Sequence, residues 1–197
     1  MSESFNSKDT FESSTSTLST TSRLRPNILL CGTPGTGKTT HALRLCRLHS
    51  LNHFPVGDIV QKNNCHEGKD EFWDAYIVNE RKLLKQLKAD IIYGGVVLDW
   101  HTCNFFPIDW IDLVVVLRTN HTILWDRLVE RKYNLRKIQE NNEAEIMQIV
   151  LEEAITSFGP ERVMVLTSDT LDQVEENIKQ ISMWIQQWKP HNFPNKE

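Results

Sequence analysis

The sequence has no strong excess of either charge and no long apolar run. It contains 22 lysines and arginines against 26 aspartates and glutamates, a formal net charge of −4. This balance argues against a general binder of nucleic-acid backbones, which normally carries a basic surface. No apolar stretch reaches the roughly 18 residues that a membrane-spanning helix needs. We therefore expect no membrane partner and no direct sequence-specific binding of nucleic acid.

Cysteine is scarce and shows no pairing pattern. The chain has four cysteines and no C-x-x-C pair, and 197 residues can bury a core without disulfides. We expect free thiols in a reducing compartment, and one domain with room for a small insertion. Cys103 lies close to His101, but two ligands without a second pair do not make a zinc site.

Large apolar side chains are rare in the first 22 residues. Thirteen of these are serine or threonine, and only Phe5, Phe11 and Leu18 are large and apolar. Such a composition cannot offset the entropy of ordering the backbone. We therefore expect a disordered tail at residues 1–25, a folded domain at 26–190 and a short second tail at 191–197.

After Pro26, short apolar runs alternate with longer amphipathic stretches. This alternation is typical of a doubly wound α/β fold, in which helices cover a sheet of buried parallel strands. The apolar runs predict strands at 27–31, 95–98, 111–117 and 163–166, with a weaker one at 53–56. The amphipathic stretches predict helices at about 38–50, 76–89, 120–131, 142–157 and 171–188.

Between the first strand and the first helix lies a phosphate-binding motif. Residues 32–39, Gly-Thr-Pro-Gly-Thr-Gly-Lys-Thr, fit the P-loop pattern G-x-x-x-x-G-K-[ST]. In such a loop the backbone N–H groups and the helix N-terminus surround the phosphates of ATP. We expect Lys38 to bridge the β and γ phosphates and the Thr39 hydroxyl to bind Mg²⁺. The residues expected to hold ATP are Gly35, Thr36, Gly37, Lys38, Thr39 and Thr40.

A second motif, Gly-Val-Val-Leu-Asp at 95–99, indicates a buried strand that ends in a carboxylate. Ligands of α/β sheets bind beyond the carboxyl ends of the strands. Asp99 is therefore expected to lie near the metal, so that Thr39 and Asp99 form the candidate Mg²⁺ site. His101 follows directly and is a candidate for positioning water or a phosphoryl acceptor.

Two arginines provide candidate charge for a transferring phosphoryl group. No N-K-x-D motif follows a strand, which excludes a GTPase and leaves a small kinase or ATPase. The stretch 126–131, Asp-Arg-Leu-Val-Glu-Arg, places Arg127 and Arg131 four residues apart on one helical face. Guanidinium groups neutralise phosphoryl charge well. We therefore count both arginines as candidate catalytic residues.

Seven ordered segments resemble the adenylate kinase isoenzyme 6 family, also called coilin-interacting nuclear ATPases. They are 26–30, 32–39, 56–58, 99–101, 106–107, 116–118 and 184–188. The resemblance implies a five-stranded parallel sheet flanked by helices, a small AMP-binding insertion at about 55–78 and a short lid at about 130–140. It also implies conversion of ATP and AMP to ADP with some ATP hydrolysis. It further implies contact with a small-subunit ribosomal protein and pre-ribosomal particles, in the nucleus and cytoplasm.

The resemblance also assigns roles to individual residues. It places Asp99 and His101 in a Walker-B-like pair and brings Arg131 to ATP from the lid. The residues it implies for the AMP side are Gly57, Asp58, Gln61 and Lys62.

Gln61 departs from the family, which usually has a basic residue at this position. Glutamine can donate a hydrogen bond but supplies no charge to an AMP phosphate. Three alternatives therefore stay open: an AMP kinase with ATPase activity, an ATP-switched assembly factor with little AMP kinase activity, and a small-metabolite kinase of similar fold.

Overall fold

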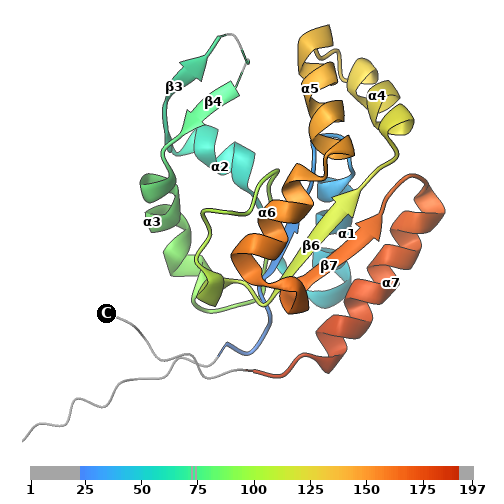
Figure 1. Ribbon diagram of the computed structural model, residues 1–197. Coiled ribbons are helices and arrows are strands. Elements are labelled where there is room, and N and C mark those ends of the chain that lie inside the picture. The colour runs from blue at the N-terminus through green and yellow to red at the C-terminus, as the bar shows by residue number, and fades with distance from the viewer. Residues whose placement is uncertain (1–22, 72, 74, 191–197) are drawn as a thin grey trace, which may run out of the picture.

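A five-stranded parallel sheet forms the centre of the molecule (Figure 1). The computed structural model describes residues 23–71, 73 and 75–190. The strand order is β2-β5-β1-β6-β7, as a doubly wound sheet requires. The strands are β1 (Ile28–Cys31), β2 (Asn52–Pro55), β5 (Val96–Asp99), β6 (Leu113–Arg118) and β7 (Val163–Thr167).

Seven α-helices and a separate hairpin surround this sheet in the described part of the chain. The helices are α1 (Lys38–His49), α2 (Val56–Lys62), α3 (Glu80–Ile91), α4 (His121–Glu130), α5 (Leu135–Ile146), α6 (Ile149–Phe158) and α7 (Leu171–Gln187). The hairpin pairs β3 (His66–Asp70) with β4 (Ala75–Val78). None of the described helices is long and apolar enough to cross a membrane.

Capping side chains mark the residues at which several helices begin. Asn79, Asn120 and Asn134 each accept a backbone N–H at the start of α3, α4 and α5. Thr170 forms a complete capping box at the start of α7. These caps satisfy N–H groups that the first turn of a helix leaves free.

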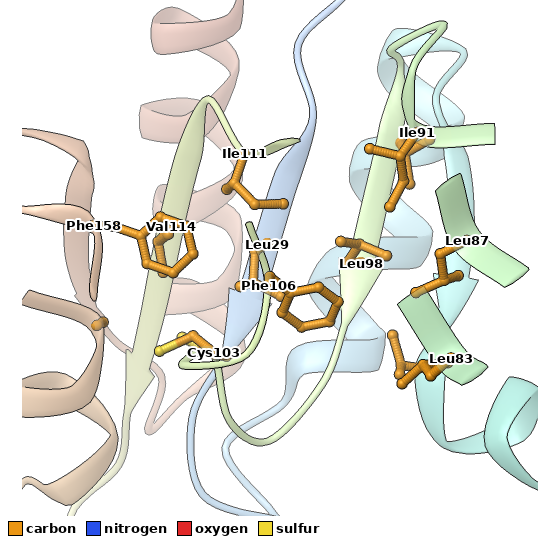
Figure 2. Packing of buried hydrophobic residues seen from close by; sticks show 14 of the residues in the cluster. Leu29, Leu83, Leu87, Ile91, Leu98, Cys103, Phe106, Ile111, Val114 and Phe158 are labelled. Atoms are coloured by element: carbon orange, nitrogen blue, oxygen red, sulfur yellow. The ribbon is translucent and has the colours of Figure 1, made fainter. Parts of the chain in front are cut away.

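The core consists of two apolar layers on opposite faces of the sheet. Along β1, Leu29 and Cys31 face a cluster with α2, α3 and α6, part of which is shown in Figure 2. Ile28 and Leu30 face a second cluster with α1 and α7. Because successive strand residues point to opposite faces, a strand that is apolar throughout serves both layers.

The five predicted strands are confirmed, and two predicted helices differ in extent. The stretch predicted at 142–157 contains the end of α5 and most of α6, which are separated at Gln148, where φ is +59°. The stretch predicted at 76–89 opens with strand β4, and its helix begins only at Glu80. The predicted insertion at 55–78 thus comprises α2 and the β3-β4 hairpin.

The folded part of the chain begins earlier than expected. Arg23 was predicted to lie in the disordered tail, but its side chain is only 5% exposed. Its guanidinium donates to Trp110 O (2.8 Å) and to Asp112 Oδ1 (2.9 Å), and Asp112 Oδ2 accepts the Asn27 N–H (2.7 Å). Arg23 therefore belongs to the folded domain and not to the tail predicted at residues 1–25, whose residues 1–22 lie outside the described part of the chain.

Replacing Arg23 tests this anchor. We expect Arg23→Ala to lower the free energy of unfolding by about 3 kcal/mol, because Asp112 is left buried without its cation. The exposed Arg25 offers a matched control, and Arg25→Ala should cost below about 1 kcal/mol. Urea unfolding measures both. Equal, small losses in the two variants would show that Arg23 does not anchor the fold.

Candidate nucleotide-binding site

The phosphate loop turns sharply between β1 and α1. Gly32 has φ +142°, and a Cβ there would lie 2.5 Å from Leu117 O. Gly35 has φ +100°, and a Cβ there would lie 2.8 Å from Leu124 Cδ1. The loop thus packs so closely on β6 and α4 that only glycine fits at these two positions. This is the conformation that the motif predicts.

The ammonium group of Lys38 lies over this loop. Nζ donates to Gly32 O (2.8 Å) and Thr33 O (3.1 Å). Burial lowers the pKa of Lys38 from its ordinary 10.5 to about 8, against the opposing effect of the Asp99 charge. Because desolvation penalises the charged amine, an anion bound in the loop would stabilise it.

Thr39 and Asp99 meet in front of the loop. Asp99 ends β5 beside β1, in register with Leu30, and its Oδ2 accepts the Thr39 hydroxyl (2.6 Å). A hydroxyl and a carboxylate are the oxygen ligands that Mg²⁺ takes beside phosphate oxygens and water. Within the described residues, no group of three His, Cys, Asp or Glu side chains could hold a metal. The site thus fits Mg²⁺ bound together with a nucleotide.

One cavity of about 240 Å³ joins the loop to the start of the insertion. Half of the predicted site residues line it. They are Lys38, Thr39, Asp99, His101 and Arg131, together with Gly57 and Asp58 from α2. Pro34, Pro55 and Trp100 complete the wall. The ATP side and the proposed AMP side therefore open into the same space.

His101 is neutral at ordinary pH. Its pKa is lowered to about 4, first by desolvation and then by the positive charges of Lys38 and Lys137. Its ring lies 4.0 Å from that of Trp100, between centroids. A neutral imidazole can hold an attacking oxygen by a hydrogen bond but adds no positive charge.

Arg127 does not line the cavity. Its guanidinium donates to three main-chain carbonyls, Gly35 O (3.2 Å), Ser168 O (2.9 Å) and Asp169 O (2.7 Å). These bonds hold the phosphate loop against the segment after β7. We therefore correct the expected role of Arg127 from phosphoryl contact to support of the loop, whereas Arg131 stays in the cavity.

Four of the predicted ATP contacts, Gly35, Thr36, Gly37 and Thr40, also do not line the cavity. Thr36 is fully buried, and its hydroxyl donates to Thr33 O (3.0 Å) within the loop. Thr40 is exposed on the first turn of α1. Gly37 is the N-cap of α1, with φ +91°. Because glycine has no side chain, only its backbone N–H could contact a phosphate.

The predicted AMP residues divide into two groups. Gly57 and Asp58 line the cavity, whereas Gln61 and Lys62 are exposed outside it. Lys62 Nζ lies 3.0 Å from Asp58 Oδ2 in an exposed pair. The structure thus does not bring the charge of Lys62 into the acceptor side.

The predicted lid at 130–140 is the turn after α4 and the first half of α5. It touches the tip of the β3-β4 hairpin. Lys137 Nζ donates to Trp73 O (3.1 Å), and the Arg136 guanidinium lies 5.1 Å from the centroid of the Trp73 ring. The insertion and the lid are therefore in contact.

The sequence analysis missed two residues of the site, of which His53 is half-buried and Glu145 is buried. His53 on β2 has its Nε2 3.5 Å from Asp99 Oδ2. Glu145 on α5 is 3% exposed and accepts the Thr33 hydroxyl of the loop (2.6 Å) and the Thr119 N–H (3.1 Å). Glu145 also pairs with Arg118 Nε (2.5 Å). No signal in the sequence distinguishes Glu145 from the other acids of its amphipathic helix.

The low pKa of Lys38 predicts proton uptake on ATP binding. At pH 8.5 most of the free protein should carry a neutral Lys38, and a bound triphosphate should raise the pKa and draw in up to about one proton. Calorimetric titration in two buffers of different ionisation enthalpy measures this uptake. Lys38→Arg is the control, since arginine stays charged. Equal heats in both buffers for the unmodified protein would contradict the prediction.

The buried carboxylate of Glu145 predicts a link between α5 and the loop. We expect Glu145→Ala to lower the free energy of unfolding by about 3 kcal/mol, because Arg118 loses its partner, and to weaken ATP binding, because Thr33 is freed. Glu140→Ala removes only an exposed pair and should change stability by below about 0.5 kcal/mol. Thermal unfolding and nucleotide titration of both variants check this. Unchanged ATP affinity in Glu145→Ala would rule out the link.

Comparisons with known proteins identify the family of the chain. Residues 28–148 match the family described as an AAA domain. The chain is 50% identical over 167 residues to the adenylate kinase isoenzyme 6 homolog of Schizosaccharomyces pombe, covering 85% of this chain and 95% of that protein. The homolog of Dictyostelium discoideum is 44% identical over 170 residues, covering 86% and 97%.

A solved structure shows the same fold. Shikimate kinase from Bacteroides thetaiotaomicron superposes with a TM-score of 0.55, covering 82% of this chain and 98% of that one at 16% identity. At this identity the likeness concerns the fold alone. Together with the phosphate loop, the fold and the relatives' names indicate a nucleotide-kinase-like enzyme. The chain belongs to the adenylate kinase isoenzyme 6 family.

Proposed function

We propose that this protein transfers the γ-phosphoryl group of ATP to AMP, and hydrolyses ATP when water takes the place of the acceptor. One observation carries the proposal. The cavity that contains Lys38, Thr39 and Asp99 is continuous with the start of the insertion at Gly57 and Asp58. A donor phosphate and an acceptor can thus meet in one space, as in-line transfer requires.

Each residue of the cavity would have its own role in such a transfer. The loop amides and Lys38 hold the phosphates, and Arg131 supplies a further positive charge on the lid side. Thr39 and Asp99 would hold Mg²⁺, which neutralises phosphate charge when it is bound. The neutral His101 is placed to orient an attacking water. Catalysis then rests on positioning and charge neutralisation.

A second candidate function is an ATP-switched assembly factor with little AMP kinase activity. The exposed Gln61 and the pairing of Lys62 with Asp58 support it, since neither brings positive charge to the acceptor side. In this role the proposed partners are a basic small-subunit ribosomal protein and pre-ribosomal particles, with action in small-subunit maturation in the nucleus and cytoplasm. The exposed acids Glu67 and Glu71 on the insertion suit a basic partner.

The two functions differ in the products they give. Purified protein is incubated with ATP and Mg²⁺, with and without AMP, and with Lys38→Ala as the blank. We expect AMP to multiply ADP output, at two ADP for each ATP consumed. If AMP has no effect and a basic small-subunit ribosomal protein changes the rate of hydrolysis instead, the assembly role is the correct one.

Residue 61 offers a direct test of the acceptor side. We expect Gln61→Arg to lower the KM for AMP about tenfold, because the longer guanidinium would supply the positive charge for the phosphate that the exposed Gln61 does not. The KM for ATP should stay unchanged. Asn63→Ala, at the exposed end of the same helix, is the matched control and should leave both constants unchanged. An unaltered KM for AMP in Gln61→Arg would show that α2 does not hold the AMP phosphate.

A further inference from the structure

A second cavity, of about 370 Å³, lies between α4 and α5, which are neighbours in Figure 1. It shares no lining residue with the nucleotide cavity. Its walls are formed by His121, Thr122 and Trp125 from α4 and by Gln139, Asn142, Glu143 and Ile146 from α5. On α4, the phosphate loop is contacted instead by Leu124 and Arg127, which lie on another face of the helix.

One lining side chain has an unused donor. Asn142 is only 7% exposed, and its Nδ2 is buried without a hydrogen-bond partner among the described residues. The adjacent Asn141 is different, since its Nδ2 donates to Lys137 O (2.6 Å). A buried amide without an acceptor is destabilising, and such groups normally find a partner. An acceptor on a molecule in the cavity would be such a partner.

The other lining groups define the chemistry of that molecule. The Trp125 indole and the Ile146 side chain form an apolar wall suited to a flat ring. The volume falls in the range of roughly 300–1,000 Å³ that small-molecule sites show. Glu143 at the cavity disfavours an anion. We propose that this cavity binds a neutral, planar heteroaromatic compound whose ring carbonyl or ring nitrogen accepts a hydrogen bond from Asn142.

The position of the cavity connects it to the phosphate loop. Asn142 and Glu145 lie three residues apart on α5, and Glu145 accepts the hydroxyl of Thr33 in the loop. A compound lodged between α4 and α5 therefore acts on the helix that holds the loop. The binding site itself does not depend on which reaction the enzyme catalyses.

Caffeine is a suitable probe, because it is planar and neutral and carries only acceptors. It is titrated into ¹⁵N-labelled full-length protein saturated with Mg²⁺ and ADP, so that the nucleotide site is filled. We expect saturable shifts of the Trp125 indole N–H and the Asn142 side-chain amide, with a dissociation constant on the order of 1 mM or below. Absence of shifts at these two groups would overturn the proposal.

Two comparisons make the test specific. Asn142→Leu keeps the shape and removes the donor, and it should weaken binding about tenfold without loss of stability, since the deleted amide had no partner. Asn141→Leu is the matched control and should bind as the unmodified protein does. Theophylline-7-acetate, an anion with the same ring system, should bind more weakly because it meets Glu143. Equal binding by Asn142→Leu, or tighter binding of the anion, would refute the assignment.

Discussion

The structure depends on a partly desolvated positive charge that is held over an anion-binding loop. Lys38 is half-buried at the wall of the cavity, with two main-chain carbonyls as its hydrogen-bond acceptors, and desolvation lowers its pKa to about 8. The neighbouring groups partly compensate this charge. Asp99 offsets part of the charge and also meets Thr39 where a metal would bind. A bound triphosphate would therefore stabilise the charged form of Lys38 further.

The loop is held from outside by side chains of distant segments. Arg127 on α4 binds the carbonyl of Gly35, and Glu145 on α5 binds the hydroxyl of Thr33. The same α5 contacts the insertion hairpin through Lys137 and Trp73. A continuous series of contacts therefore joins the hairpin, α5 and the phosphate loop.

Sequence patterns identified the parts of the site that are local in the chain. The phosphate loop is eight consecutive residues, and Asp99 ends an apolar run, so both could be predicted. Glu145 and His53 could not, because only the chain topology brings α5 and β2 to Thr33 and Asp99. Arg127 was misassigned for a related reason. Helical spacing places it on the face of Arg131, but does not show that carbonyls of the loop and of Ser168 and Asp169 occupy its donors.

The acceptor side is where charge decides between the two proposed activities. An AMP phosphate is an anion that must enter a cavity already prepared for ATP, and its repulsion has to be offset by nearby cations. Arg131 and Lys38 line that cavity, but α2 contributes only a glycine and a carboxylate to it. Water needs no such compensation. We therefore expect the balance between the proposed transfer and hydrolysis to depend on how much positive charge the insertion and lid bring over the acceptor.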